Sequence, residues 1–462
     1  MNRKTSSVFL FLIGMFSHTQ IYIGGAIGIS ELFVFALAPF IFLQDYGTLK
    51  RDGFLPLVYL ILLSLIGCVI SCAVNGTAFA YESRGLMANY GFFACVIVFH
   101  RLLRNNLTGV RWFLLGVAIS FVISTFVFHG ATELAQYGGN DVKHATTGIV
   151  SSPLFWATRL GSFWVLPYSG WYMTTPQVWN YLSPAIWGVV FLFFSQGSGR
   201  SGALTMFAAS VVLLACGKSQ QRIRRVSRNI GIYLLIGIPF LFAFTTLYRN
   251  FARSGILGAN AQVKYERQVK GKRSPLQILM AGRGEFFVGL TACLNRPLVG
   301  YGPWAIDKDG IYEEWLNKYG DQEDLENYYK YLEYVRKSSG ISQYHLIPAH
   351  SVIISFWLSY GIMGFVLWVY ILYRIWYYLR HDMDAVPHLL GYLAGWIPMY
   401  LWNIFFSPFG GRLEYGAFLS ALLLCSAVKK GVILLPDRMI RDIVRANNGG
   451  GGNATVTFNS YC

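Results

Sequence analysis

The stretch Ala349–Tyr373 reads AHSVIISFWLSYGIMGFVLWVYILY and contains no Asp, Glu, Lys or Arg. An α-helix of about 20 apolar residues crosses the roughly 30 Å hydrocarbon layer of a bilayer. The stretch therefore predicts a transmembrane helix. The whole chain agrees with this, since 54% of its 462 residues are apolar and only 13% are charged. Soluble domains carry about 25% charged residues.

Similar apolar runs recur along the chain. Together they predict an all-α integral membrane protein with about 12 transmembrane helices. The run at 148–168 has two interpretations, because Arg159 lies near its middle and a charge inside the bilayer is costly. It is either a full span or a re-entrant segment. The predicted spans are 6–22, 28–44, 54–74, 86–100, 112–128, 148–168, 179–196, 201–217, 230–247, 349–373, 387–406 and 413–428.

Lysine and arginine gather in alternate loops. With twelve spans and a cytoplasmic N-terminus, the inner segments hold 19 Lys and Arg and the short outer loops hold 4. Basic residues favour the cytoplasmic side, so we predict this topology, with both termini inside. If 148–168 lay outside the membrane, the later basic loops would face outward. Most of the net charge of +16 then comes from basic residues that orient the chain in the membrane. We therefore expect no nucleic-acid partner.

The segment 248–348 has a different composition. It carries 14 basic and 11 acidic residues, half of all the acids in the chain. We predict that it forms one large loop domain on the outer side, between the ninth and tenth spans. Residues 1–247 then hold helices 1–9, and 349–428 hold helices 10–12. Residues 429–462 form a cytoplasmic, partly disordered tail that is rich in glycine.

Two arginines are candidates for binding an anion. Arg200 lies in GSGRSG (197–202), which opens the eighth span. A glycine-rich turn at a helix N-terminus exposes N–H groups at the positive end of the helix dipole, and an arginine there suits phosphate. A snorkelling arginine in a tight turn explains the same residues. Arg283 in AGRGE (281–285) is the second candidate, or else a solvated loop arginine.

His350 and Ser351 precede the tenth span. The helix dipole disfavours a protonated imidazole at this position, so His350 can act as a general base. An N-capping pair without chemistry is the alternative. The predicted topology places His350, Arg200 and Arg283 on one face, where the arginines would stabilise a diphosphate leaving group. Because the chain lacks a clear cluster of carboxylates, we expect metal-independent chemistry and no cofactor; Asp307 and Asp309 lie in a turn.

The order of three motifs resembles the O-antigen ligase and O-antigen polymerase superfamily of bacterial envelopes. The resemblance is topological over most of the chain and extends to motifs between 195 and 375. It implies about twelve helices with one large periplasmic loop domain before a late span. It also implies a place in the bacterial inner membrane, with the active site facing the periplasm. The motifs are GSGRSGALTMF (197–207), GRGEFF with NRPLVGYGP (282–303), and HSVIISFWLSYGIMGFVLWV (350–369).

The resemblance further implies a reaction. A glycan would move from an undecaprenyl-diphosphate donor to a hydroxyl of a second glycan or of a lipid A-core acceptor. By motif, Arg200 and Arg283 would hold the diphosphate and His350 would activate the hydroxyl. Arg159 resembles a further diphosphate-binding arginine, although the Pro-Asn that often follows it is missing. The interval from Arg159 to Gly170 fits the Arg-x10-Gly spacing of polymerases, but with 48 glycines in the chain it leaves ligase and polymerase undecided.

Two other classes of protein fit parts of the sequence. A transporter or flippase of lipid-linked oligosaccharides would explain the spans and an intramembrane arginine. It would also predict internal repeats and helices broken at the midplane, and the sequence has no convincing repeat. A structural membrane protein would not need Arg200, Arg283 and His350 on one face. Glycan transfer is therefore the preferred interpretation.

Overall fold

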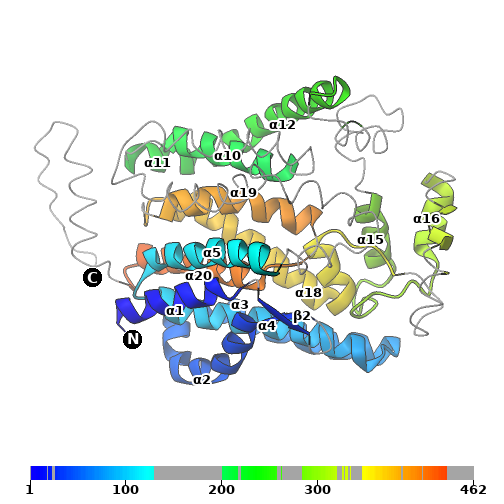
Figure 1. Cartoon of the computed structure of the whole chain (residues 1–462), viewed down its shortest axis with the longest axis horizontal. Helices are drawn as coiled ribbons and strands as arrows, with labels where there is room; N and C mark the ends of the chain where they lie inside the picture. Colours follow the sequence, from blue (N-terminus) through cyan, green and yellow to red (C-terminus); the bar gives the residue numbers. More distant parts are fainter. Residues whose placement is uncertain are drawn as a thin grey trace, which may run out of the picture.

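The computed structural model describes residues 2–17, 19–22, 26–128, 200–216, 220–256, 262, 284–319, 325–326, 328–330, 333, 346–386, 389–407 and 409–433. These residues are mostly helical (Figure 1). In chain order the elements are α1 (Arg3–Met15), β1 (Gln20–Tyr22), β2 (Ala26–Gly28), α2 (Ile29–Arg51), α3 (Leu55–Asn75), α4 (Phe79–Leu103), the 3-10 turn η1 (Leu107–Gly109), α5 (Val110–Phe128), α10 (Arg200–Cys216), α11 (Gln220–Arg228), α12 (Ile230–Arg253), α15 (Gly284–Asn295), α16 (Ile311–Tyr319), α18 (Val352–Tyr377), the π-helical turn η2 (Tyr378–Asp382), α19 (Leu390–Phe406) and α20 (Arg412–Lys429).

Each predicted span that falls among the described residues overlaps a helix, although the first does so only in part. The spans predicted at 148–168 and 179–196, and with them Arg159, lie outside the described residues. Among the described helices, α2, α3, α4 and the continuous helix Val352–Asp382 are long and apolar enough to cross a membrane. The chain is thus a helical membrane protein. The full number of about twelve spans and the exact domain limits stay predictions.

The first predicted span, 6–22, is wrong in its second half. Helix α1 ends at Met15, and Gln20–Tyr22 instead pairs antiparallel with Ala26–Gly28. The β-branched Ile21 and Ile27 lie opposite each other in this ribbon, which suits a strand better than a helix. The ribbon leads into α2, where the Glu31 carboxylate accepts a hydrogen bond from Gly28 N at 3.1 Å.

Most of the helices run side by side along the long axis of the molecule, while α15 and α16 stand across it at one end (Figure 1). At one end, Ser351 Oγ before α18 donates to the carbonyl of Ile404 in the last turn of α19 at 2.9 Å. Helices α15 and α16 also lie here, and we name this the α15 end. At the other end, Ser227 Oγ of α11 donates to the carbonyl of Leu379 just after α18 at 2.6 Å. We name this the α11 end.

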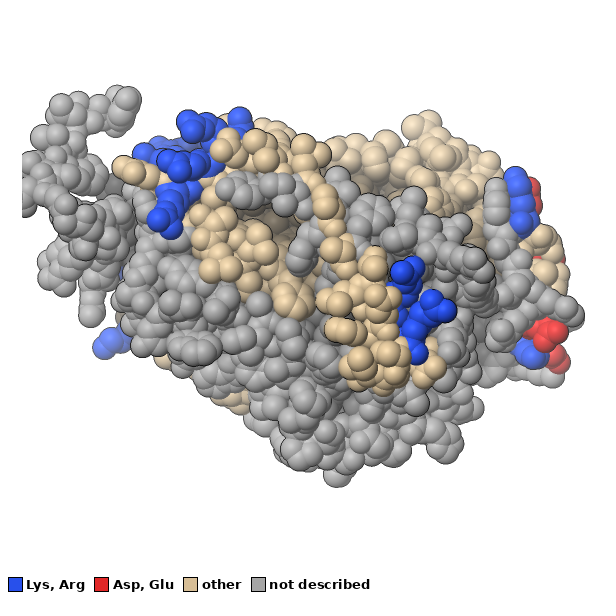
Figure 2. Space-filling view, turned by 90° about the horizontal axis from the view of Figure 1, so that it is seen from above, with Lys and Arg blue, Asp and Glu red and all other residues tan. Residues whose placement is uncertain are grey.

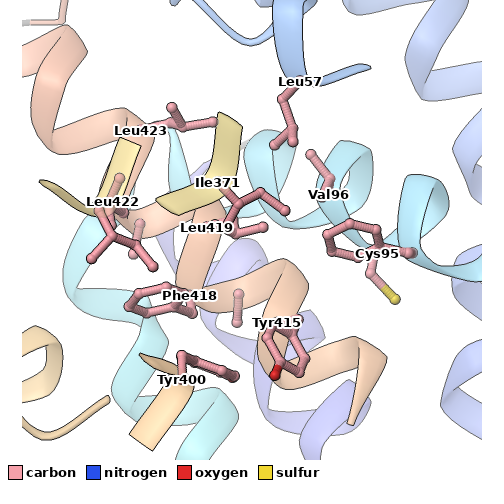
Figure 3. Packing of buried hydrophobic residues seen from close by; sticks show 14 of the residues in the cluster. Leu57, Cys95, Val96, Ile371, Tyr400, Tyr415, Phe418, Leu419, Leu422 and Leu423 are labelled. Carbon is pink, nitrogen blue, oxygen red and sulfur yellow. The ribbon is translucent and has the colours of Figure 1, made fainter. Parts of the chain in front are cut away.

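Side chains from α3, α4, α18, α19 and α20 meet in the core (Figure 3). Helix α20 lies in the middle, with Phe418 and Leu422 fully buried against α4 and α19. Tyr400 of α19 packs on Phe418 with ring centroids 4.4 Å apart. Because lipid tails are as apolar as these side chains, close packing rather than transfer from water favours association of the helices.

Helices α1 and α5 approach so closely that their backbones touch at glycines. A Cβ on Gly116 would lie 2.2 Å from the carbonyl oxygen of Phe11, and one on Gly14 would lie 2.1 Å from that of Phe113. We therefore expect Gly116→Ala to lower the free energy of unfolding by about 1–3 kcal/mol, as overpacking does. Thermal unfolding in detergent measures this change.

The matched control for Gly116→Ala is Gly47→Ala in α2. A Cβ on Gly47 meets no atom within 4 Å. There the better helix propensity of alanine predicts a gain of up to about 1 kcal/mol. Equal shifts in the two variants would contradict the close approach of α1 and α5.

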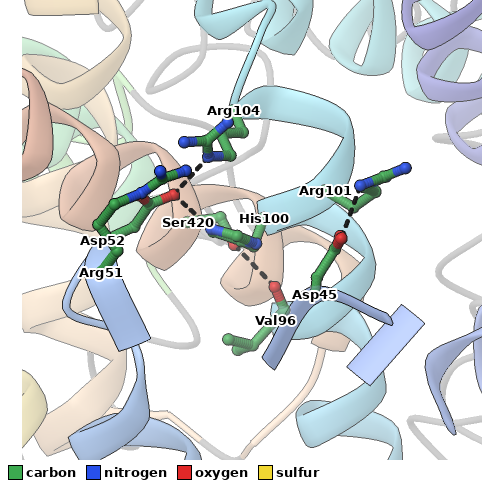
Figure 4. A network of polar contacts seen from close by, with 8 residues as sticks. All are labelled: Asp45, Arg51, Asp52, Val96, His100, Arg101, Arg104 and Ser420. Atoms are coloured by element: carbon green, nitrogen blue, oxygen red, sulfur yellow. Dashed lines mark hydrogen bonds and ion pairs between the residues drawn. The ribbon is translucent and has the colours of Figure 1, made fainter. Parts of the chain in front are cut away.

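A buried polar cluster ties three helices together at the α11 end (Figure 4). Asp52 Oδ2 lies 2.9 Å from His100 Nε2 and accepts a hydrogen bond from Arg104 Nε at 2.7 Å. Burial alone would raise the pKa of Asp52, but these two partners outweigh it and hold the pKa below its ordinary value. The charged carboxylate therefore fixes the α2–α3 connection to the end of α4.

The surface of the α11 end is basic. Helix α11 buries Ile223 and Val226 and exposes Arg222, Arg225 and Arg228. Basic side chains gather over α11 in Figure 2, a second basic group lies farther along this face, and acidic side chains show only at its far end. Such a one-sided basic helix is typical of a position at the membrane surface.

Candidate active site

Helix α15 is placed by close contact with the start of α18. A Cβ on Gly289 would lie 2.6 Å from Ile354 Cγ2 and 3.4 Å from the carbonyl oxygen of Pro348. Val288 and Cys293 are fully buried on the same helix. The segment before α18 therefore passes directly beside the first turns of α15.

This contact brings His350 and Glu285 together. The two side chains form an ion pair between His350 Nδ1 and Glu285 Oε2. Glu285 lies in the first turn of α15, where the helix dipole stabilises a carboxylate. The His350 side chain is 56% exposed and that of Glu285 is 34% exposed. The imidazole is therefore accessible from solvent, while the carboxylate is partly shielded from water.

The backbone on both sides of His350 is held in place. Ser351 caps α18, since its Oγ accepts a hydrogen bond from Ile354 N at 3.4 Å and also donates to α19. On the other side, the carbonyl of Ala349 accepts a hydrogen bond from Ser355 Oγ at 2.9 Å. The capping interpretation of Ser351 is confirmed, and it leaves the imidazole of His350 to face Glu285.

Of the three arginines expected to bind the diphosphate, only Arg200 lies among the described residues. Arg200 is the first residue of α10, as GSGRSG predicts. Helix α10 packs against α19 and leads through its C-terminal end into α11, so Arg200 lies at the end of α10 that points away from α11. Arg283 lies outside the described residues, immediately before α15 and two positions before Glu285. Arg159 also lies outside them.

The acidic residues of the 307–309 turn have structural partners. Asp307 caps α16, because its carboxylate accepts hydrogen bonds from Ile311 N at 2.9 Å and Tyr312 N at 2.8 Å. Asp309 binds Arg296 at 2.7 Å and the hydroxyl of Tyr301 at 2.7 Å. Within the described part of the chain, no group of three His, Cys, Asp or Glu is arranged to hold a metal ion.

The tyrosines at 328 and 329 pack the loop region onto α16. Tyr328 is buried with its ring 5.4 Å from that of Tyr312, and Tyr329 donates to Glu313 at 2.7 Å. Burial, together with the charges of Glu313 and Asp307, raises the pKa of Tyr328 to about 12. These contacts support a packing role for the two residues.

The segment 296–303 fills a break in α18. Gly361 has φ 63° and ψ −156° inside that helix, and Ile362 N donates to the carbonyl of Leu298 at 3.1 Å. Tyr301 N donates to the carbonyl of Leu358 at 2.6 Å. The predicted loop domain is thus packed into the helical bundle along 284–303, and this packing holds α15 beside His350.

Glu285 is the residue that sequence reasoning missed. It lies in AGRGE, two positions after Arg283. An acidic residue at the start of an apolar helix gives a capping signal, and that signal does not identify a partner 65 positions further along the chain. No protein-family model, curated protein or solved structure matches the chain.

Proposed function

We propose that the chain is a membrane glycosyltransferase of the O-antigen ligase or polymerase type, with His350 as its general base. The observation that carries the proposal is the His350–Glu285 pair at the α15 end. A carboxylate beside Nδ1 favours the imidazole tautomer that keeps its proton on Nδ1 and its lone pair on Nε2. That lone pair would accept the proton of an acceptor hydroxyl.

The proposed reaction is a displacement at the anomeric carbon of the donor sugar. The acceptor oxygen forms a bond to this carbon as its proton passes to His350 Nε2. The bond from the same carbon to the phosphate oxygen breaks, and undecaprenyl diphosphate leaves with the electron pair. Glu285 stabilises the imidazolium that forms. Arg200, Arg283 and Arg159 are proposed to bind the diphosphate and offset its developing charge.

The charge distribution supports a periplasmic position for this site in the bacterial inner membrane. The exposed arginines of α11, together with Arg380 and Lys430, lie at the opposite end of the bundle. Basic residues favour the cytoplasmic side of a membrane. A donor that had already crossed the membrane would then meet the acceptor at the α15 end.

Transfer by purified protein in nanodiscs tests the proposal. The donor is an oligosaccharide on undecaprenyl diphosphate, and the acceptor is lipid A-core in one arm and a second donor molecule in the other. We expect Glu285→Gln to lower turnover by about 10²- to 10⁴-fold, because the amide no longer selects the tautomer. The KM for the donor should change little.

Glu314→Gln in α16 is the matched control, because Glu314 is exposed and the substitution is the same. It should retain wild-type turnover. Product in the lipid A-core arm identifies a ligase, and product in the other arm identifies a polymerase. In sealed proteoliposomes, donor that crosses the membrane without transfer would support a flippase instead.

A further inference from the structure

Trp304 has an unusual backbone conformation. Its φ is 57°, and among the described residues it is the one non-glycine with positive φ. A bulky side chain in this left-handed region costs about 1–3 kcal/mol, and such strain concentrates at functional sites. The residue is nevertheless 41% exposed. The fold therefore holds Trp304 at the surface with a backbone conformation that is unfavourable for a bulky residue.

The neighbours of Trp304 form a platform on α4. Its ring stacks on Tyr81 with centroids 5.8 Å apart and planes 15° apart. The guanidinium of Arg84, one helical turn further on, lies 5.6 Å from the ring centroid. Pro303 fixes the approach, because a Cβ on Gly85 would lie 2.2 Å from Pro303 Cγ. An aromatic ring is thus presented beside a phenol hydroxyl and a guanidinium.

The platform is connected to the candidate active site by backbone pairing. Ile347 N donates to the carbonyl of Ala305 at 2.8 Å, and Ile306 forms an antiparallel bridge with Leu346. His350 follows Ile347 by three residues, which span at most about 11 Å. Trp304 and His350 therefore lie at the same end of the bundle, at a separation that a short oligosaccharide can bridge.

We propose that Trp304, with Tyr81 and Arg84, is a subsite that stacks a pyranose ring of the glycan being transferred. The inference rests on the proposed function for the identity of that glycan. Aromatic faces suit the apolar face of a sugar, and phenol and guanidinium groups suit its hydroxyls. A lipid anchor would require neither the strained backbone nor the polar neighbours. Phe79, which is 80% exposed at the start of α4, fits a lipid anchor better.

Binding to an array of immobilised bacterial surface oligosaccharides that carry no lipid tests the subsite. The full chain is presented in nanodiscs, and because the arrayed glycans carry no lipid, insertion of a lipid into the bilayer does not contribute to the signal. We expect wild-type protein to bind at least one glycan, and Trp304→Gly to bind it at least about tenfold more weakly. Glycine is chosen because it accepts positive φ without strain. Trp304→Phe, which keeps an aromatic face, should restore part of the binding.

Phe79→Ala is the control for a lipid anchor and should bind the array as wild type does. An array on which wild type binds no glycan, or on which Trp304→Gly binds equally well, would overturn the subsite. His350→Ala should bind normally while losing transfer. If His350→Ala still transfers glycan while Trp304→Gly loses array binding, the proposed reaction fails and the sugar site stands.

Discussion

Gly361→Ala is expected to destabilise the protein by about 3 kcal/mol or more. Gly361 has φ 63° and ψ −156°, a region open essentially only to glycine. A Cβ there would also lie 2.2 Å from the carbonyl oxygen of Leu298, which is backbone and cannot rotate away. The substitution would push the 296–303 segment out of the break in α18. Thermal unfolding of detergent-purified protein measures the loss.

Gly310→Ala separates the cost of a positive φ from the cost of a steric clash. Gly310 has φ 69°, but a Cβ there meets nothing within 4 Å. It should therefore show only the cost of the positive φ, about 1 kcal/mol. If Gly361→Ala is no more damaging than Gly310→Ala, the segment 296–303 is not packed against α18 as described.

His350→Ala is expected to lower the turnover of glycan transfer by about 10²- to 10⁴-fold, the usual contribution of a positioned general base. The donor KM should change little, because the arginines rather than His350 are proposed to bind the diphosphate. Millimolar imidazole should restore part of the activity by replacing the missing base. The measurement is transfer in nanodiscs with the donor at saturation.

His381→Ala is the control for this loss. His381 is exposed just after α18 at the opposite end of the bundle and packs on Tyr377 with centroids 4.8 Å apart. It should retain wild-type turnover. An equal loss in both variants would indicate a general effect of removing a histidine and would argue against a role for His350 as the base.

Hydropathy predicted the helices because the bilayer imposes length and apolarity on a spanning segment. The run at 349–373 lies largely within α18, and α10 begins at Arg200, next to the predicted start of the eighth span. Ser351 was predictable as a cap because its side chain acts on the local backbone. These features depend on neighbours in the sequence.

The features that were missed depend on contacts between distant segments. Glu285 meets His350 only because Gly289 allows α15 to approach Pro348 and Ile354. The break at Gly361 is explained only by the backbone of Leu298, which packs into it. The periodicity of either segment does not encode the partner of the other, so these contacts were beyond the reach of pattern reasoning.

A double-mutant cycle in the reconstituted transfer assay, run in EDTA, tests the central claim most directly. The four proteins are wild type, Glu285→Gln, His350→Ala and the double variant. If Glu285 acts through His350, wild type transfers glycan and the double variant is no slower than His350→Ala alone. Inactive wild type, full activity in His350→Ala, or additive losses in the double variant would contradict the account.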